Sequence, residues 1–163
     1  MQSLKEYWRA YGGAKAFLSS RYLHVSMALA AFLFVFVRRT PEMLDFPFSA
    51  PLKFSAPLLG FTLLCMMLSM VQNVRFADIL KSRDDGESAD MPSPFLVTAA
   101  SFAHFAFTHA ATLLNAVIGS VLPERHEIYW LFSMWLMSYE ILLTFAVVGA
   151  VFKLSEWYDA FKP

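Results

Sequence analysis

One acidic residue, Glu140, lies inside an apolar run that includes Met137, Ile141 and Leu142. If that run crosses a bilayer, a charged side chain at its centre costs about 2.5–3.5 kcal/mol. The carboxyl group is therefore expected to face other helices or a cavity rather than lipid. Such a group can bind a proton or a cation, or it can hold helices together through hydrogen bonds.

A stripe of polar and small side chains recurs with helical spacing in the preceding apolar run. At about 100° per residue these side chains fall within about 80° of one another. The opposite face carries Phe102, Ala106, Leu113 and Val117, which we expect to meet lipid. The polar face predicts either a packing seam between helices or the wall of a water-filled pathway. The stripe consists of Ser101, His104, Thr108, Thr112, Asn115 and Gly119.

The two polar features are expected to lie side by side. Only the short segment 123–127 separates their apolar runs, which predicts a tight antiparallel helical hairpin. His104 or His109 then becomes the natural partner of Glu140, and a protonated carboxyl group bonded to histidine or hydroxyl groups would avoid a buried charge. The candidate membrane-embedded site comprises Glu140, His104, His109, Thr108, Asn115, Ser101, Thr112 and Thr144.

Motifs of soluble enzymes are absent from the sequence. It has no Walker loop, no Gly-x-Ser-x-Gly, no His-Glu-x-x-His and only one cysteine, Cys65. We therefore expect no enzyme activity, no metal site and no bound cofactor. One alternative remains, because His24 and His104 on facing helices could ligate haem.

Composition and hydropathy place these residues in membrane-spanning helices. The chain is 58% hydrophobic and 16% charged, whereas soluble domains are about 45–50% apolar and about 25% charged. Four stretches approach the length of about 20 residues that a helix needs to cross the hydrocarbon core, roughly 22–37, 54–74, 95–121 and 128–152. The prediction is an all-α fold, a four-transmembrane-helix bundle that forms a single integral membrane domain over residues 1–163.

The basic residues predict that both termini are cytoplasmic. With the N-terminus inside, the cytoplasmic side receives nine of them: Lys5, Arg9, Lys15, Arg21, Arg75, Lys81, Arg83, Lys153 and Lys162. The opposite side keeps four, namely Arg38, Arg39, Lys53 and Arg125. The positive-inside rule favours this orientation, and we expect a bacterial inner membrane. The net charge of zero gives no reason to expect contact with nucleic acid.

The segments outside the spans differ in character. Residues 1–21 have the pattern of a short interfacial helix that is broken near Gly12 and Gly13. Residues 38–53 contain several prolines and predict a compact cap on the outer surface. The loop 75–94 is the most polar stretch and predicts a solvated linker or a docking site for a soluble partner. Its charged residues include Arg83, Asp84, Asp85, Glu87 and Asp90.

The length and the arrangement of spans resemble those of several small bacterial inner-membrane subunits. The plan is most similar to that of the membrane component of the Kiwa anti-phage system, which assembles as an oligomer and recruits a soluble cytoplasmic effector. Small immunity proteins against pore-forming bacteriocins share the plan. The resemblance lies in the plan of the chain and carries over no residue roles, but it implies a sensor or scaffold without catalytic activity.

Three functional hypotheses follow from these features. The first is a non-catalytic, oligomeric membrane sensor or scaffold that couples the bilayer to a cytoplasmic partner, in the setting of anti-phage defence. The second is an ion- or proton-conducting channel subunit that uses Glu140 and the polar stripe. The third is a haem-bearing membrane anchor of an electron-transfer complex.

Overall fold

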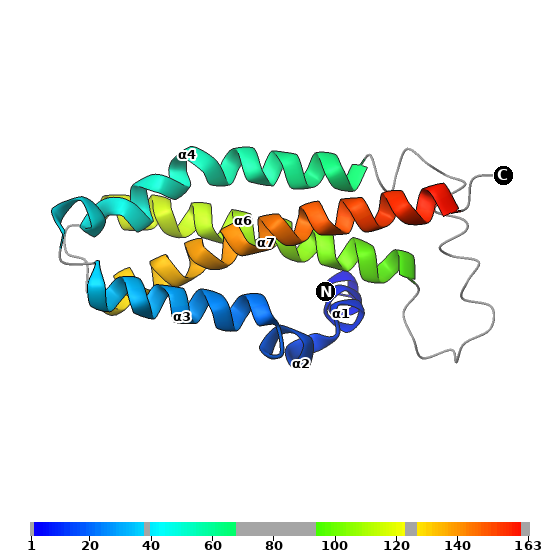
Figure 1. The fold of residues 1–163 in the computed structure, drawn as a ribbon, viewed down its shortest axis with the longest axis horizontal. Coiled ribbons are helices and arrows are strands. Elements are labelled where there is room, and N and C mark those ends of the chain that lie inside the picture. Colours follow the sequence, from blue (N-terminus) through cyan, green and yellow to red (C-terminus); the bar gives the residue numbers. More distant parts are fainter. Residues whose placement is uncertain (1, 38–39, 68–93, 123–126, 161–163) are drawn as a thin grey trace.

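The computed structural model describes residues 2–37, 40–67, 94–122 and 127–160, and these residues form helices without any strand (Figure 1). A short N-terminal pair precedes the longer helices. The helices are α1 (Gln2–Tyr11), α2 (Gly13–Leu18), α3 (Arg21–Phe36), α4 (Pro41–Met66), α6 (Pro94–Val121) and α7 (Glu127–Ala160). The expected all-α fold is therefore confirmed for the described residues.

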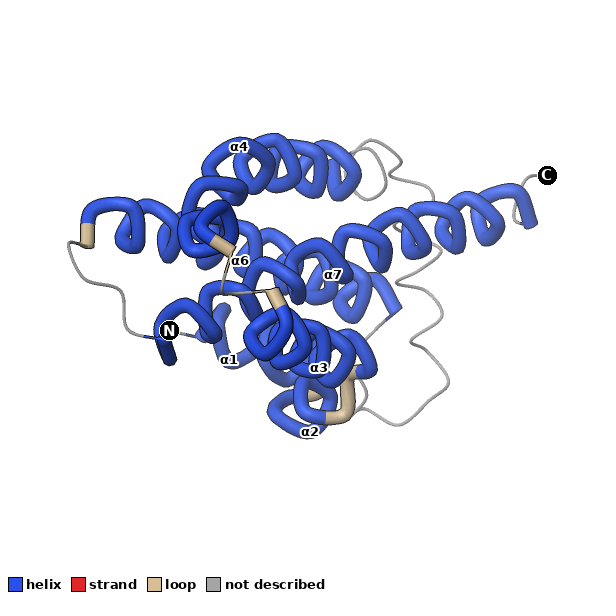
Figure 2. The backbone as a smooth tube through the Cα atoms, turned by 60° about the vertical axis from the view of Figure 1, so that its left-hand side comes forward, coloured by secondary structure: helices blue, strands red, loops and turns tan. Residues whose placement is uncertain are grey.

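Helices α6 and α7 form the centre of the bundle. α4 packs mainly against α6, and α3 packs against α7 on the other side of this central pair (Figures 1 and 2). The short helix α1 lies against α6. Each outer helix buries only one face in this arrangement, so its other face is left to lipid or to another chain.

Three helices are long and apolar enough to cross a membrane. Their candidate spans are Glu42–Met66, Leu96–Val121 and Glu127–Phe152, as expected of a multi-pass membrane protein. α3 is apolar but has only 16 residues. At 1.5 Å per residue it is about 24 Å long, which is less than the hydrocarbon core of about 30 Å.

The prediction of a compact loop over residues 38–53 is wrong from Pro41 onward. That part belongs to the 26-residue helix α4, which carries Pro47, Pro51 and Pro57 in its interior. Pro41 fits the first turn, where its missing N–H costs nothing, and the interior prolines bend the helix without ending it. Figure 1 shows the bend in the first half of α4. The predicted second span also extends to residues 68–74, which lie outside the described residues.

Other boundaries follow the sequence closely. α6 and α7 reproduce the predicted spans 95–121 and 128–152, although α7 continues as a helix to Ala160. The predicted break in the N-terminal helix is confirmed, because Gly12 and Gly13 have φ values of 92° and 65°. This left-handed backbone favours glycine, which has no Cβ to clash.

The expectation that Phe102 meets lipid is wrong. Its side chain is 0% exposed and belongs to an apolar cluster with Phe105, Tyr139 and Leu143. The reason is that α6 contacts α1, α4 and α7, so more than its polar face is covered. On the same predicted face, Val117 remains 47% exposed.

Gly119 permits the close contact between α6 and α4. A Cβ atom at this position would collide with the ring of Phe48, which is 1% exposed. We predict that Gly119→Ala lowers the free energy of unfolding by about 1–3 kcal/mol, the usual cost of overpacking a filled core.

Gly149→Ala is the matched control, because a Cβ there meets no atom within 4 Å. Alanine is the better helix former by about 1 kcal/mol, so this variant should be at least as stable as the wild type. Thermal unfolding in mild detergent measures both changes. Equal stability of the two variants would contradict the proposed contact.

Candidate functional site in the seam between α6 and α7

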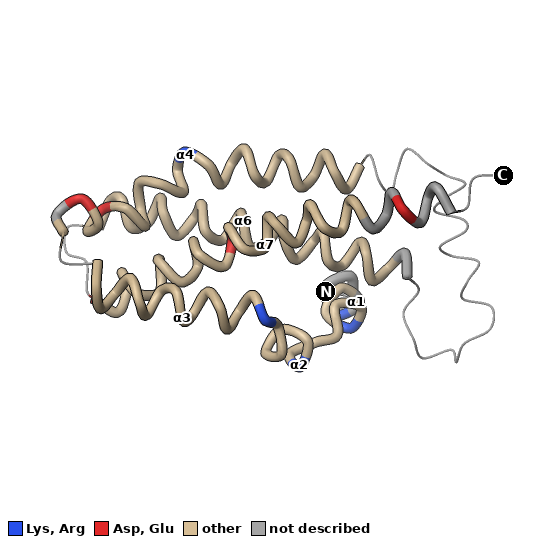
Figure 3. The backbone as a smooth tube through the Cα atoms, in the orientation of Figure 1, with Lys and Arg blue, Asp and Glu red and all other residues tan. Residues whose placement is uncertain are grey.

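Glu140 lies at the junction of three helices. Its side chain and that of His109 are both 0% exposed, and Glu140 Oε1 is 2.9 Å from His109 Nδ1. The hydroxyl group of Ser55 on α4 donates a hydrogen bond of 2.9 Å to Glu140 Oε2. Figure 3 shows the acidic position in the middle of α7. One carboxyl group thus connects α4, α6 and α7.

The contact between Glu140 and His109 allows two arrangements of one shared proton. A carboxylic acid can donate to a neutral imidazole, or an imidazolium can donate to a carboxylate. Both arrangements are neutral overall, so neither leaves a net charge inside the bundle. The second ring nitrogen of His109, Nε2, is buried and has no hydrogen-bond partner among the described residues.

His104 is not a partner of Glu140. It lies between two tyrosines, with Nδ1 3.0 Å from the Tyr7 hydroxyl and Nε2 2.9 Å from the Tyr139 hydroxyl. The Tyr11 ring stacks on the imidazole at a centroid distance of 4.2 Å. Burial raises the pKa of the Tyr7 and Tyr11 phenols, so both remain neutral hydrogen-bonding groups at ordinary pH.

These contacts attach the N-terminal helix to the bundle. Of the two partners predicted for Glu140, His109 is therefore confirmed and His104 is wrong. An interfacial location for residues 1–21 stays a prediction, but α1 also has a specific docking site on α6.

A third polar cluster lies toward the hairpin connection. Asn115 Nδ2 donates a 2.9 Å hydrogen bond to Ser133 Oγ, and Ser133 donates to the Tyr129 carbonyl oxygen at 2.8 Å. The Tyr129 hydroxyl returns a 3.0 Å bond to the Asn115 carbonyl oxygen. This closed set of bonds fixes the register of α6 against α7.

The remaining hydroxyl groups of the predicted site bond to their own helices. Thr108 donates to the His104 carbonyl oxygen, Thr112 to that of Thr108, and Thr144 to that of Glu140. Ser101 donates to the Val97 carbonyl oxygen and lies outside the buried seam. The stripe is therefore divided into separate clusters and does not form one continuous surface.

The structure does not present His24 and His104 as an open pair of ligands. His24 is exposed, and its Nδ1 lies 2.8 Å from the Ser20 carbonyl oxygen. Both nitrogens of His104 contact tyrosine hydroxyls, so haem ligation would require one of these bonds to break. No group of three or more His, Cys, Asp or Glu side chains suitable for a metal ion occurs within the described segments. The predicted docking residues Arg83, Asp84, Asp85, Glu87 and Asp90 lie outside them.

Sequence reasoning missed three participants, Ser55, Tyr7 and Tyr139. Ser55 was missed because its turn of α4 lies at the edge of the segment assigned to a loop. Tyr7 pairs with a residue 97 positions away, and no local pattern reports such a contact. Tyr139 offered one signal, since it is a tyrosine in an apolar run directly before Glu140, and a buried phenol requires a partner.

No family model, curated protein or solved structure matches the chain.

We predict that Ser55→Ala lowers the free energy of unfolding by about 0.6–2 kcal/mol, the range for one hydrogen bond between helices in a membrane. Ser120→Ala is the control, because Ser120 is exposed and bonds only within its own helix. In a Glu140→Leu background, Ser55→Ala should cause no further loss. Equal losses in both backgrounds would show that Ser55 does not act through Glu140.

Proposed function

We propose that the chain is a four-span subunit of a bacterial inner membrane with both termini on the cytoplasmic side. α3 supplies the fourth span. α3 begins toward the same end of the bundle at which α7 finishes (Figure 1). The excess of basic residues on that side favours a cytoplasmic location.

We further propose that this subunit is a non-catalytic scaffold that couples the bilayer to a soluble cytoplasmic partner. The observation that carries this proposal is the continuation of α7 beyond its apolar span. The span ends at Phe152 and the helix ends at Ala160, a difference of eight residues. At 1.5 Å per residue this extension projects about 12 Å past the span, where a soluble protein can contact it.

The hydrogen bonds between α6, α7 and their neighbouring helices also support the proposed scaffold function. Glu140 connects α7 to α4 and α6, and His104 connects α6 to α1 and α7. Polar groups that are bonded to neighbouring helices hold a bundle in one arrangement. A rigid bundle of this kind is suited to presenting its cytoplasmic end to a partner.

Self-association is a further part of the proposal. α3 leaves large apolar side chains exposed over most of its length, and these can contact lipid or a second copy of the chain. They include Val25, Met27, Phe32, Val35 and Phe36. The length of the chain and the arrangement of its spans resemble those of the Kiwa membrane component. We therefore propose anti-phage defence as the setting.

Native mass measurement in mild detergent tests the scaffold. The full chain should purify as an oligomer with one soluble protein in a fixed ratio. A variant that ends at Phe152 should keep the oligomer and lose the soluble protein, because it lacks the α7 extension. A monomer without a partner, or a partner that is retained by the shortened variant, would contradict the proposal.

A second candidate function is proton conduction, and His109 is the observation that favours it. Its Nε2 atom is buried without a partner, while its Nδ1 atom contacts the titratable group of Glu140. A proton shared by this pair could move onward only if other groups or water reach His109 Nε2.

Flux measurements in liposomes separate this candidate from the scaffold. A conducting subunit should acidify liposomes faster than empty controls, and Glu140→Gln should reduce this rate by about tenfold or more, because the titratable group is lost. Ser120→Ala serves as the control. Rates equal to those of empty liposomes for both proteins would exclude conduction.

A further inference from the structure

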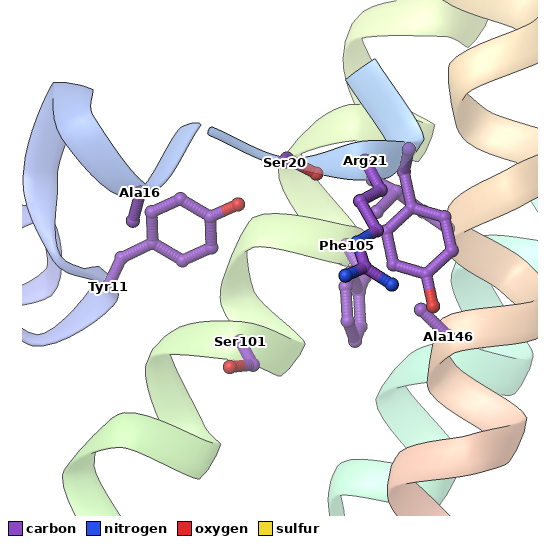
Figure 4. A pocket seen from close by; sticks show the side chains of 9 residues that line it. Tyr11, Ala16, Ser20, Arg21, Ser101, Phe105 and Ala146 are labelled. Carbon is purple, nitrogen blue, oxygen red and sulfur yellow. The ribbon is translucent and has the colours of Figure 1, made fainter. Parts of the chain in front are cut away.

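A pocket of about 470 Å³ lies where the N-terminal helices meet the bundle (Figure 4). Its walls come from α1, α2, the start of α3, α6 and α7. The volume falls within the range of about 300–1,000 Å³ that is typical of small-ligand sites. The pocket is separate from the contact between Glu140 and His109, and the proposed scaffold function does not use it.

One wall of the pocket is polar and carries a cation. Figure 4 shows the Arg21 guanidinium group directed into the space beside the ring of Phe105, with the Tyr11 hydroxyl directed toward the same space. Arg21 has no carboxylate partner within the described residues. A guanidinium group presents several N–H donors in a planar fork, which matches the oxygens of a phosphate group.

The pocket also has an apolar wall. It includes Phe105, beside which the Arg21 guanidinium group lies, and Leu143, which are 7% and 2% exposed, together with Ala146. A simple inorganic anion gains nothing from such a wall. A molecule with a phosphate group and an attached hydrocarbon would use both walls at once.

The surroundings of the pocket are basic. Lys5, Arg9 and Lys15 are exposed on α1 and α2, and Figure 3 shows basic positions on α1, on α2 and at the start of α3. Basic clusters beside a membrane attract anionic lipids by about 1 kcal/mol for each Lys or Arg. The charge therefore favours an anionic ligand over a zwitterionic one.

The depth of the pocket agrees with the level of lipid headgroups. Arg21 begins α3, a helix about 24 Å long, and in the proposed four-span arrangement this first residue lies near one face of a bilayer whose core is about 30 Å thick. α6 and α7 extend beyond this level (Figure 1). A headgroup could therefore enter from the side while its acyl chains remain in lipid.

We propose that this pocket binds the headgroup of an anionic phospholipid. The phosphate group contacts the Arg21 guanidinium group, and the glycerol carbons and the first acyl carbons pack against Phe105 and Leu143. The bound lipid fills the junction between the N-terminal helices and the bundle.

Native mass spectrometry of the full chain tests this proposal with phosphatidylglycerol, phosphatidylcholine and inorganic phosphate as separate probes. We expect one phosphatidylglycerol to bind at least about fivefold more tightly than phosphatidylcholine, given the attraction of the basic residues. Arg21→Gln should weaken phosphatidylglycerol binding by about fivefold or more, since it removes the charged fork.

Two further variants keep the result interpretable. Lys15→Gln removes an equal charge from an exposed position that does not line the pocket, and it should weaken binding less than Arg21→Gln does, because only the Arg21 guanidinium group is placed to bond to the phosphate group. Ala146→Phe fills the apolar side without a change of charge and should also abolish selective binding. Circular dichroism and thermal unfolding show whether each variant is folded.

Three results would overturn the proposal. Equal losses for Arg21→Gln and Lys15→Gln would indicate general attraction to the surface. Inorganic phosphate that binds as tightly as phosphatidylglycerol would identify an anion site that does not recognise lipid. Selective lipid binding that persists in folded Ala146→Phe would place the lipid elsewhere on the chain.

Discussion

The burial of Glu140 is the constraint on which the arrangement of the long helices depends. A carboxyl group without solvent must have partners, because an unpaired polar group in an apolar medium costs several kcal/mol. His109 and Ser55 provide these partners from two other helices. This requirement fixes both the rotation of α6 and α7 about their axes and the position of α4, since a turn of any of these helices would remove a bond that water cannot replace.

The requirement that buried polar groups have partners also holds on both sides of the contact between Glu140 and His109. His104 is bonded by Tyr7 and Tyr139, and Asn115 takes part in a closed set of bonds toward the hairpin connection. Apolar clusters fill the space between these polar clusters. Because lipid surrounds the bundle, the hydrophobic effect alone does not choose one arrangement of the helices. Hydrogen bonds and close packing, as at Gly119, make that choice.

Two features available to other molecules, the pocket and the extension of α7, lie at one end of the bundle. The short helices α1 and α2 pack there, and the pocket that contains Arg21 opens between them and the long helices. The extension of α7 to Ala160 lies toward the same end. The buried seam provides rigidity, and this end provides the exposed chemistry. A scaffold that senses or anchors to anionic lipid and presents a surface to a soluble partner would use both parts.

The sequence by itself determined the helical fold, the limits of α6 and α7 and the break at Gly12, because hydropathy, length and glycine act locally. It also identified two histidines, His104 and His109, as the natural partners of Glu140, since a tight hairpin restricts which residues share a depth. Only the tertiary structure decided that His109 is the partner and that Ser55 completes the site. Local rules assign a proline-rich segment to a loop, yet the packing of α4 against α6 and α7 keeps it helical. The contact of Tyr7 with His104 spans 97 residues, and such a contact forms only when the whole bundle brings the two side chains together.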